Sequence, residues 1–270
     1  VLDKAGYNAW REFYVNDAGN QIEKFGCSLE ARYLQIFKGD EIEFPEDGYQ
    51  GEDIKDLAKE YADLNGDSLV NVSAEERKKA LVDYALPKNI KKMQADMEKY
   101  KIYYDKWFFE SELHKSGAVK AVVDLLTKKG LTYEKEGAVW YKNKEVLTQK
   151  LLKEGKSQKY IDNLELKDDV LIRQNGNPTY FTADIAYHKN KFDRGFTTLI
   201  DVWGADHHGH VMRTKGAMDA IGYDGDKLNV VLMQLVKLVK DGELVKMSKR
   251  TGKAIQLGDL LDEVPVDSAR

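Results

Sequence analysis

The chain has 270 residues, of which 42% are hydrophobic and 33% charged, enough for one or two domains with a buried core. The formal net charge of −4 argues against a general nucleic-acid coat, so any RNA contact has to use local basic patches. The single cysteine, Cys27, leaves no intrachain disulfide and no cysteine-based zinc site, which suits a reducing cytosol. No stretch approaches the ~20 apolar residues of a membrane span and no signal peptide is present, so we expect a cytoplasmic protein without a membrane partner.

The first hundred residues predict one strand followed by helices. Residues 10–16 are rich in strand formers, and apolar side chains then recur at helical spacing from Ile22 to about Phe37. Residues 52–99 are helical and highly charged, which is typical of an insertion rather than of a sheet core. Within them, Ser73 followed by Glu76 is a capping-box signature and predicts the start of a helix.

The remainder of the chain alternates strand and helix signals. Apolar strands at 101–109, 197–203 and 229–239, with helices between them, predict a mostly parallel α/β sheet. Short signals over 131–181 predict a small β-containing insertion. The other predicted elements are a helix from Ser111 to Gly130, strands at 131–137, 138–143, 169–174 and 179–182, and helices at 145–163, at 184–194 and up to about Ile221.

The strongest chemical signal is the basic segment Lys246-Met247-Ser248-Lys249-Arg250, which continues into Thr251-Gly252-Lys253. Two lysines, a hydroxyl and a glycine on a loop after an apolar strand can close over a triphosphate. They can neutralise the charge that builds up when pyrophosphate leaves. Two lysines alone more often form a solvated turn, but the complete pentapeptide after a strand favours ATP binding.

A second signal, Gly204-Ala205-Asp206-His207-His208-Gly209-His210, directly follows the predicted strand at 197–203. Ligands bind at the carboxyl ends of parallel strands in α/β sheets. Histidine and carboxylate side chains can hold zinc, and histidines separated by glycines can instead hydrogen-bond a nucleotide. For this motif alone, the metal, nucleotide and purely structural interpretations stay open; together with the basic loop, nucleotide and amino-acid binding is favoured.

Two further segments contain candidate binding residues. In residues 180–188, Thr182 or Asp184 can simply cap the following helix. Alternatively Asp184 faces a pocket, where a carboxylate can meet a guanidinium through two parallel hydrogen bonds. In residues 16–21 the Asn and Asp explain a turn and a helix cap, but they do not explain Gln21, which can orient polar substrate groups.

These motifs together resemble the arginyl-tRNA synthetases, a family of class I aminoacyl-tRNA synthetases, in their bacterial form. The segments that carry the resemblance are FYVNDAGNQIEKFG, WFFESELHKSG, YFTADIAYHKNKFDRGF, WGADHHGH, VKMSKRTGK and LGDLLDEVPVDSAR, and they extend from residue 13 to residue 270. The resemblance implies a Rossmann-type catalytic domain, a doubly wound parallel sheet with helical and small β insertions. It implies ATP-dependent activation of L-arginine to arginyl-adenylate and transfer to tRNA(Arg), with Mg²⁺ accompanying ATP, in a monomer.

The resemblance also implies roles residue by residue. The substrate arginine is expected to contact Tyr180, Asp184, His207 and Gln21. ATP is expected to contact Gly204, Asp206, His210, Met247 and Lys249. The catalytic residues are expected to be Lys246, Ser248 and Lys249, and no resident metal ion is expected.

This sequence departs from the family in one segment. Class I enzymes carry a His-x-Gly-His segment after their first strand, whereas the only His-Gly-His here, at 208–210, follows a later strand. We therefore expect a segment cut from a longer protein, without the first central strand and inactive alone. The expected parts are the truncated start of the catalytic domain (1–50), a helical insertion (51–100), the third strand and helix (101–130), a β-containing insertion (131–181), the second catalytic half with the basic loop (182–263), and the start of a connection to a C-terminal anticodon-binding domain (264–270).

Two other classes of protein stay open at this point. One is a metal hydrolase built on Asp206 and the three histidines at 207, 208 and 210. The other is a non-catalytic RNA-binding module with residues 52–99 as its contact face. That face mixes both signs of charge, which argues against strong phosphate binding.

Overall fold

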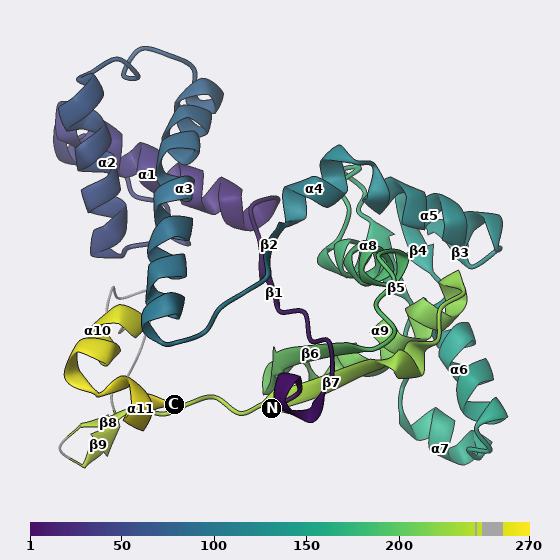
Figure 1. The fold of residues 1–270 in the computed structure, drawn as a ribbon. Coiled ribbons are helices and arrows are strands. Elements are labelled where there is room, and N and C mark those ends of the chain that lie inside the picture. Colours follow the sequence, from purple (N-terminus) through teal and green to yellow (C-terminus); the bar gives the residue numbers. More distant parts are fainter. Residues whose placement is uncertain (241, 245–255) are drawn as a thin grey trace. The chain divides into compact units, whose positions relative to one another are not determined.

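The structure, a computed structural model, describes residues 1–240, 242–244 and 256–270 (Figure 1). The chain divides into two compact units, the first formed by Val1–Phe109 with Leu238–Arg270 and the second by Glu110–Lys237. None of the helices in these described ranges is long and apolar enough to cross a membrane.

The first unit contains a parallel strand pair and a group of three long helices. Its elements are β1 (Glu12–Val15), α1 (Asn20–Lys38), α2 (Glu52–Asn65), α3 (Ala74–Lys99), β2 (Lys106–Phe109), β8 (Val239–Lys240), β9 (Glu243–Leu244), α10 (Leu257–Glu263) and α11 (Val266–Ala269), with 3-10 turns at Asp3–Ala5 and Gly39–Glu41. β1 and β2 run in parallel, from Glu12 opposite Lys106 to Val15 opposite Phe109. The strand and helix predicted at the start of the chain are confirmed.

The helices α1, α2 and α3 enclose a hydrophobic core of their own, because each turns an apolar face toward the others. The hydroxyl of Ser73 accepts a hydrogen bond from the backbone N of Glu76 at 3.2 Å, so the predicted start of α3 is confirmed. The buried members of this core are Phe25, Leu29, Tyr33, Ile54, Leu57, Ala58, Ala62, Leu69, Leu81 and Ala85.

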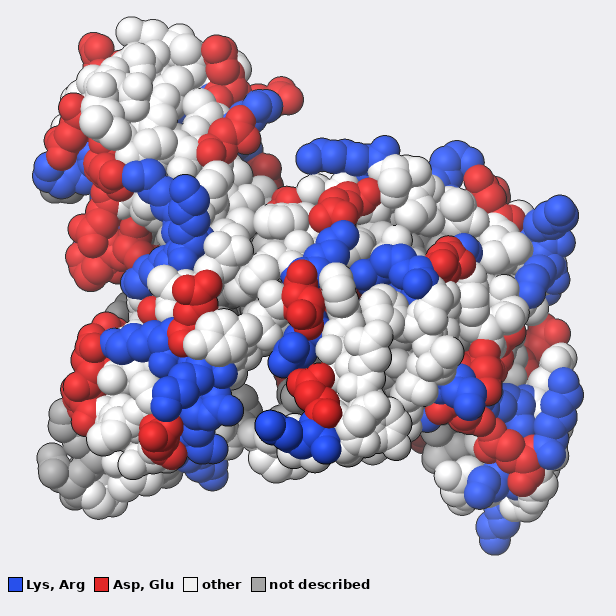
Figure 2. All heavy atoms as spheres, viewed as in Figure 1, with Lys and Arg blue, Asp and Glu red and all other residues white. Residues whose placement is uncertain are grey.

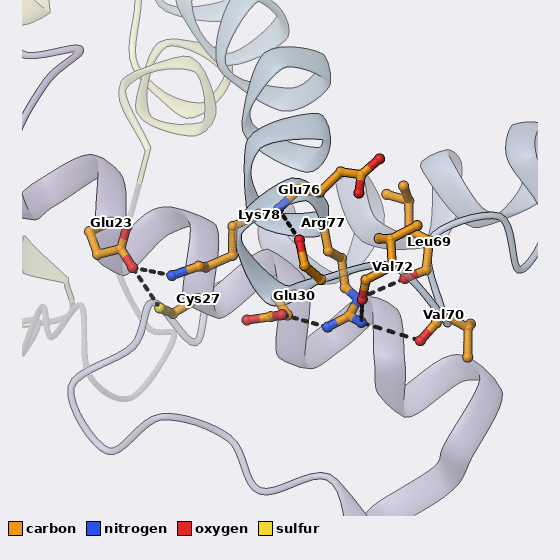
Figure 3. Close-up of polar contacts among 10 residues, drawn as sticks. Glu23, Cys27, Glu30, Leu69, Val70, Val72, Glu76, Arg77 and Lys78 are labelled. Carbon is orange, nitrogen blue, oxygen red and sulfur yellow. Dashed lines mark hydrogen bonds and ion pairs between the residues drawn. The ribbon is translucent and has the colours of Figure 1, made fainter.

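Arg77 is a buried cation within this helical group (Figure 3). Its Nη1 donates to Oε1 of Glu30 and its Nε to the carbonyl of Leu69, both at 2.7 Å. Its Nη2 donates to the carbonyls of Val70 at 3.2 Å and Val72 at 2.7 Å. One guanidinium therefore satisfies three carbonyls of the connection between α2 and α3, which fixes the path of that connection.

The second unit contains an antiparallel sheet, a parallel pair and the helices around them. Its elements are α4 (Glu110–Lys115), α5 (Ala118–Lys128), β3 (Thr132–Lys135), β4 (Ala138–Tyr141), α6 (Asn143–Lys153), α7 (Gln158–Asn163), β5 (Asp169–Ile172), α8 (Tyr180–Asp193), β6 (Leu199–Gly204), α9 (His208–Ile221) and β7 (Leu228–Met233), with 3-10 turns at Ala205–His207 and Gly225–Lys227. β3, β4 and β5 are antiparallel, and β6 and β7 are parallel from Leu199 opposite Leu228 to Gly204 opposite Met233. α9 packs against α8 and β7.

Four local predictions were wrong. Residues 179–182 begin α8 instead of forming a strand, because Thr179 is its N-cap and the hydroxyl of Thr182 donates to the carbonyl of Leu171 at 2.7 Å. The helix predicted from Ser111 to Gly130 is divided at Gly117, and the helix predicted over 145–163 is divided at Gly155. Both glycines have positive φ, 73° and 79°, a conformation that side chains disfavour. The strand predicted to 239 ends at Met233.

The α/β class predicted from the sequence is confirmed at the level of a mixed fold with parallel and antiparallel sheets. Across the described residues, the strands form the sheets β1–β2, β3–β4–β5, β6–β7 and β8–β9. A single doubly wound sheet is therefore not part of what the structure describes.

Candidate active site on helices α8 and α9

Six predicted binding residues lie on elements of the second unit. Asp184 lies in the second turn of α8 and Tyr180 begins that helix; Gly204 ends β6, and the chain passes through a 3-10 turn into α9. Asp206 and His207 lie in that turn and His210 in the first turn of α9. α8 packs against α9, so the two helices that carry Asp184 and His210 lie side by side (Figure 1).

Asp184 is a partly buried carboxylate, and among the residues that the structure describes no side chain or backbone group hydrogen-bonds to it. Burial raises the pKa of Asp184 to about 6; the charge of His188 opposes this rise, and the charge of Glu110 adds to it. Since the N-cap of α8 is Thr179, the interpretation of Asp184 as a helix cap is wrong. A carboxylate in this state gains from a cationic ligand.

The nucleotide side of the site is built on α9. Nη2 of Arg213 lies 2.6 Å from Nδ1 of His210, and Nη1 of Arg213 lies 2.5 Å from Oδ1 of Asp169. Burial lowers the pKa of His210, and the charges of Arg213 and His207 lower it further. Asp206 and His207 are exposed, with side-chain exposures of 82% and 54%, so both are accessible to a ligand.

Two buried polar residues near Asp184 are missing from the sequence-based prediction. Glu110 begins α4, and His188 lies on α8 one turn after Asp184; both influence the charge state of Asp184. Glu110 and His188 both occur inside segments that carried the family resemblance. The spacing of four residues between Asp184 and His188 is the signal that places them on one face of a helix.

The remaining predicted residues lie elsewhere. Gln21 is in the first unit, on α1, where its amide oxygen accepts a hydrogen bond from the hydroxyl of Tyr49. The predicted catalytic and ATP residues of the basic loop, Lys246, Met247, Ser248 and Lys249, lie outside the described residues. Within the described ranges, no group of three or more His, Cys, Asp and Glu side chains is arranged to hold a metal ion.

The surface of the charged helices has both signs of charge. On the face shown in Figure 2, Lys and Arg are interspersed with Asp and Glu. On α2 and α3, Lys59 pairs with Asp63 at 2.5 Å, and Lys79 pairs with Asp83 at 2.5 Å. Cations that are already paired in this way are weak phosphate ligands, which argues against an RNA-binding face here.

Comparison with known proteins gives the class of protein. No family model matches the chain. The fold is similar to that of a Campylobacter jejuni protein assigned as an arginyl-tRNA synthetase, with a TM-score of 0.81 and 36% identity over 99% of this chain and 54% of that one. The Thermus thermophilus arginyl-tRNA synthetase matches with a TM-score of 0.63 at 18% identity, covering 97% of this chain and 46% of that one, which shows the fold alone. The fold is therefore that of an aminoacyl-tRNA synthetase.

The sequence comparison specifies the member of that class. The chain is 55% identical to the arginine–tRNA ligase of Ruminiclostridium cellulolyticum over 272 residues, and 57% identical to that of Caldanaerobacter subterraneus subsp. tengcongensis over 271 residues. Both matches cover 100% of this chain and 45% of the relative. The chain is thus related over its whole length to the arginine–tRNA ligases, as the resemblance implied, and it spans about half the length of the curated relatives it matches.

Proposed function

We propose that this chain is the catalytic-core segment of a cytoplasmic, monomeric ligase that joins L-arginine to tRNA(Arg) through arginyl-adenylate, with ATP as the second substrate. The names of its relatives and their match over the whole chain support this activity. The single observation that carries the proposal is Asp184, a partly buried carboxylate without a hydrogen-bond partner among the described residues. Such a group fits the guanidinium of the substrate.

Arginine recognition would depend on charge and on planar geometry. Asp184 would accept two parallel hydrogen bonds from the guanidinium, which an ammonium cannot supply in the same geometry. Tyr180, 42% exposed at the start of the same helix, would supply a hydroxyl and an aromatic face. His207 and Gln21 would contact other polar atoms of arginine. Lysine would leave part of this arrangement unpaired, so discrimination would not require editing.

Adenylate formation needs positioning more than covalent chemistry. The carboxylate of arginine attacks the α-phosphorus of ATP, and pyrophosphate leaves. Gly204, Asp206 and His210, at the carboxyl end of β6, would position the nucleotide. Lys246, Ser248 and Lys249 would stabilise charge on the departing pyrophosphate. Mg²⁺ would accompany the ATP phosphates.

We also propose that the fold is of the Rossmann type, with the helices of 51–100 and the small sheet of 131–181 as insertions. The parallel pairing of β1 with β2 and of β6 with β7 supports this proposal. So does one face of β6–β7, which exposes Ile200, Val202, Val231 and Met233, because parallel sheets are usually covered on both faces. The first central strand would lie outside these 270 residues, and the chain alone would be inactive.

The decisive experiment measures arginine-dependent pyrophosphate exchange in the full-length ligase that contains this chain. Asp184→Asn should raise the KM for arginine by about 30-fold or more, since truncating one partner of a buried charge pair costs about 2–5 kcal/mol. The KM for ATP should stay within about twofold. Asp193→Asn is the matched control, because Asp193 lies at the end of the same helix and pairs with Lys189. An unchanged KM for arginine in the Asp184 variant contradicts the proposal.

A further inference from the structure

His188 makes two contacts that define its protonation state. The ring is buried, with 3% of the side chain exposed. Its Nδ1 lies 2.7 Å from the backbone carbonyl oxygen of Asp184, and its Nε2 faces Oδ2 of Asp201. A carbonyl and a carboxylate only accept hydrogen bonds, so each ring nitrogen has to donate. A ring that donates from both nitrogens carries a proton on each, which is the imidazolium form.

Asp201 is the counter-ion of this imidazolium, and it has a second cationic partner. Nζ of Lys191 donates to Oδ1 of Asp201 at 2.8 Å. Burial raises the pKa of Asp201, but the hydrogen bond from His188 and the charges of His188 and Lys191 outweigh it, and the pKa lies well below its usual range. Two cations thus share one carboxylate, and the group of three has one positive charge in excess.

The excess charge lies next to Asp184. The ionisable groups that act on Asp184 come from four elements: Glu110 from α4, His188 from α8, Asp201 from β6 and Arg213 from α9. The two carboxylates favour a protonated Asp184, and the two cations favour an ionised one. His188 has the larger effect of the two cations, and Arg213 is already paired with Asp169.

We propose that His188 is a positioning residue for arginine recognition: held as an imidazolium by Asp201 and Lys191, it keeps Asp184 in the charged form that a guanidinium requires. This inference rests on the proposed function, because it takes Asp184 as the partner of the substrate guanidinium. His188 does not touch the substrate. It acts through its charge and through its hydrogen bond to the backbone of Asp184, which fixes the turn of α8 that carries the carboxylate.

A pH profile of the full-length ligase separates a charge effect from simple support of the fold. In the unsubstituted enzyme, kcat/KM for arginine should fall as Asp184 becomes protonated, with its pKa of about 6. His188→Gln keeps a hydrogen-bond donor for Asp201 but removes the positive charge of the ring. The fall in kcat/KM at acidic pH, the acidic limb of the profile, should therefore move to higher pH by about one unit. Arginine affinity should recover at pH 8–9, where Asp184 ionises unaided. Asp193→Asn, which leaves His188, Lys191 and Asp201 in place, should not shift it.

Each outcome has a defined meaning. An unshifted limb in His188→Gln, together with a raised KM for arginine in Asp184→Asn, overturns the role of His188 and leaves the proposed function intact. An unchanged KM for arginine in Asp184→Asn overturns both. If the His188 variants fail to fold, nitrogen-15 NMR of the unsubstituted protein at pH 7 still decides. Two ring nitrogens with imidazolium shifts support the proposal, and a neutral ring overturns it.

Discussion

Arg213 on α9 forms an ion pair with Asp169 at the start of β5, with 2.5 Å between Nη1 and Oδ1. The same guanidinium lies 2.6 Å from Nδ1 of His210 and stacks over the ring of Phe181, 4.9 Å from its centre. Nη2 of Arg213 also lies 2.7 Å from Nε2 of His210, and burial together with the charge of Arg213 lowers the pKa of His210, which favours the neutral ring. Asp169 of the small antiparallel sheet thus holds Arg213 in place. Arg213 in turn contacts His210, a residue predicted to bind the nucleotide.

Arg213→Met should lower the free energy of unfolding by about 1–3 kcal/mol, because it leaves the mostly buried carboxylate of Asp169 without its cation. Burial raises the pKa of Asp169 even next to Arg213, so the loss should stay below that of a fully buried pair. Urea denaturation measures it. Asp124→Asn removes an exposed pair with Lys120 in the same unit and should cost less than about 0.5 kcal/mol. Equal losses in both variants would show that the Arg213 pair does not contribute.

Asp184→Asn should stabilise the protein at neutral pH, although it abolishes the proposed arginine contact. The folded-state pKa of about 6 lies above the unfolded value of about 3.9, so the folded protein binds this proton more tightly. Asp184 therefore lowers stability as pH rises from about 4 to 6, and above that range its penalty is constant. The variant should gain about 1–3 kcal/mol at pH 7.5, discounted for partial exposure, and less at pH 5.

Urea denaturation at the two pH values tests this sign. Asp193→Asn is a control of opposite sign: burial raises the pKa of Asp193, but the hydrogen bonds from Lys189 and Tyr223 lower it by more. Asp193→Asn should therefore destabilise the protein slightly at pH 7.5. A destabilised Asp184 variant at both pH values would show that Asp184 supports the fold rather than a ligand.

Arg77→Ala should destabilise the helical group of the first unit by about 3–5 kcal/mol. The substitution leaves the carbonyls of Leu69, Val70 and Val72 without their donor and leaves the carboxylate of Glu30 without its cation (Figure 3). Urea denaturation followed by circular dichroism measures the loss. Lys79→Ala, two residues along the same helix, removes only an exposed pair with Asp83 and should change stability by less than about 0.5 kcal/mol.

The sequence predicted the elements whose signals are local. Helix α1 follows from apolar side chains at helical spacing, and α3 begins at the predicted cap Ser73. The strand predicted over 179–182 was wrong, because there the local signal was misleading. The threonines and aromatic residues of this segment have high strand propensity. However, the hydroxyl of Thr179 donates to the carbonyl of Val170, and Thr179 starts a helix. Tertiary hydrogen bonds overrode the local preference there.

Site residues that belong to a sequence motif could be predicted. Site residues that matter only because the fold places them near Asp184 could not. Tyr180, Asp184 and His210 follow from their motifs, although their roles in binding stay predictions. Glu110 and Asp201 gain their importance only because the fold places them beside Asp184. Neither residue type nor spacing along the chain indicates that proximity, so the sequence alone did not select them.

The final prediction concerns Lys249, which lies outside the described residues and is argued from sequence. Residues 227–253 contain seven Lys or Arg and two acidic residues, an excess that can attract ATP without any single lysine. Charge on the leaving pyrophosphate peaks in the transition state, where a positioned cation acts most strongly. Lys249→Ala should therefore lower kcat for adenylate formation by about 100-fold or more and raise the KM for ATP much less.

Pyrophosphate exchange and stopped-flow kinetics on the full-length ligase measure these two effects separately. Lys237→Ala removes the same charge from the same basic stretch, at an exposed position before the loop, and should change both constants by less than about twofold. If Lys249→Ala instead raised the KM for ATP and left kcat unchanged, the lysine would contribute ground-state binding only. A lower kcat in Lys249→Ala and not in Lys237→Ala would mean that the position of the charge, and not the local excess, assists the departure of pyrophosphate.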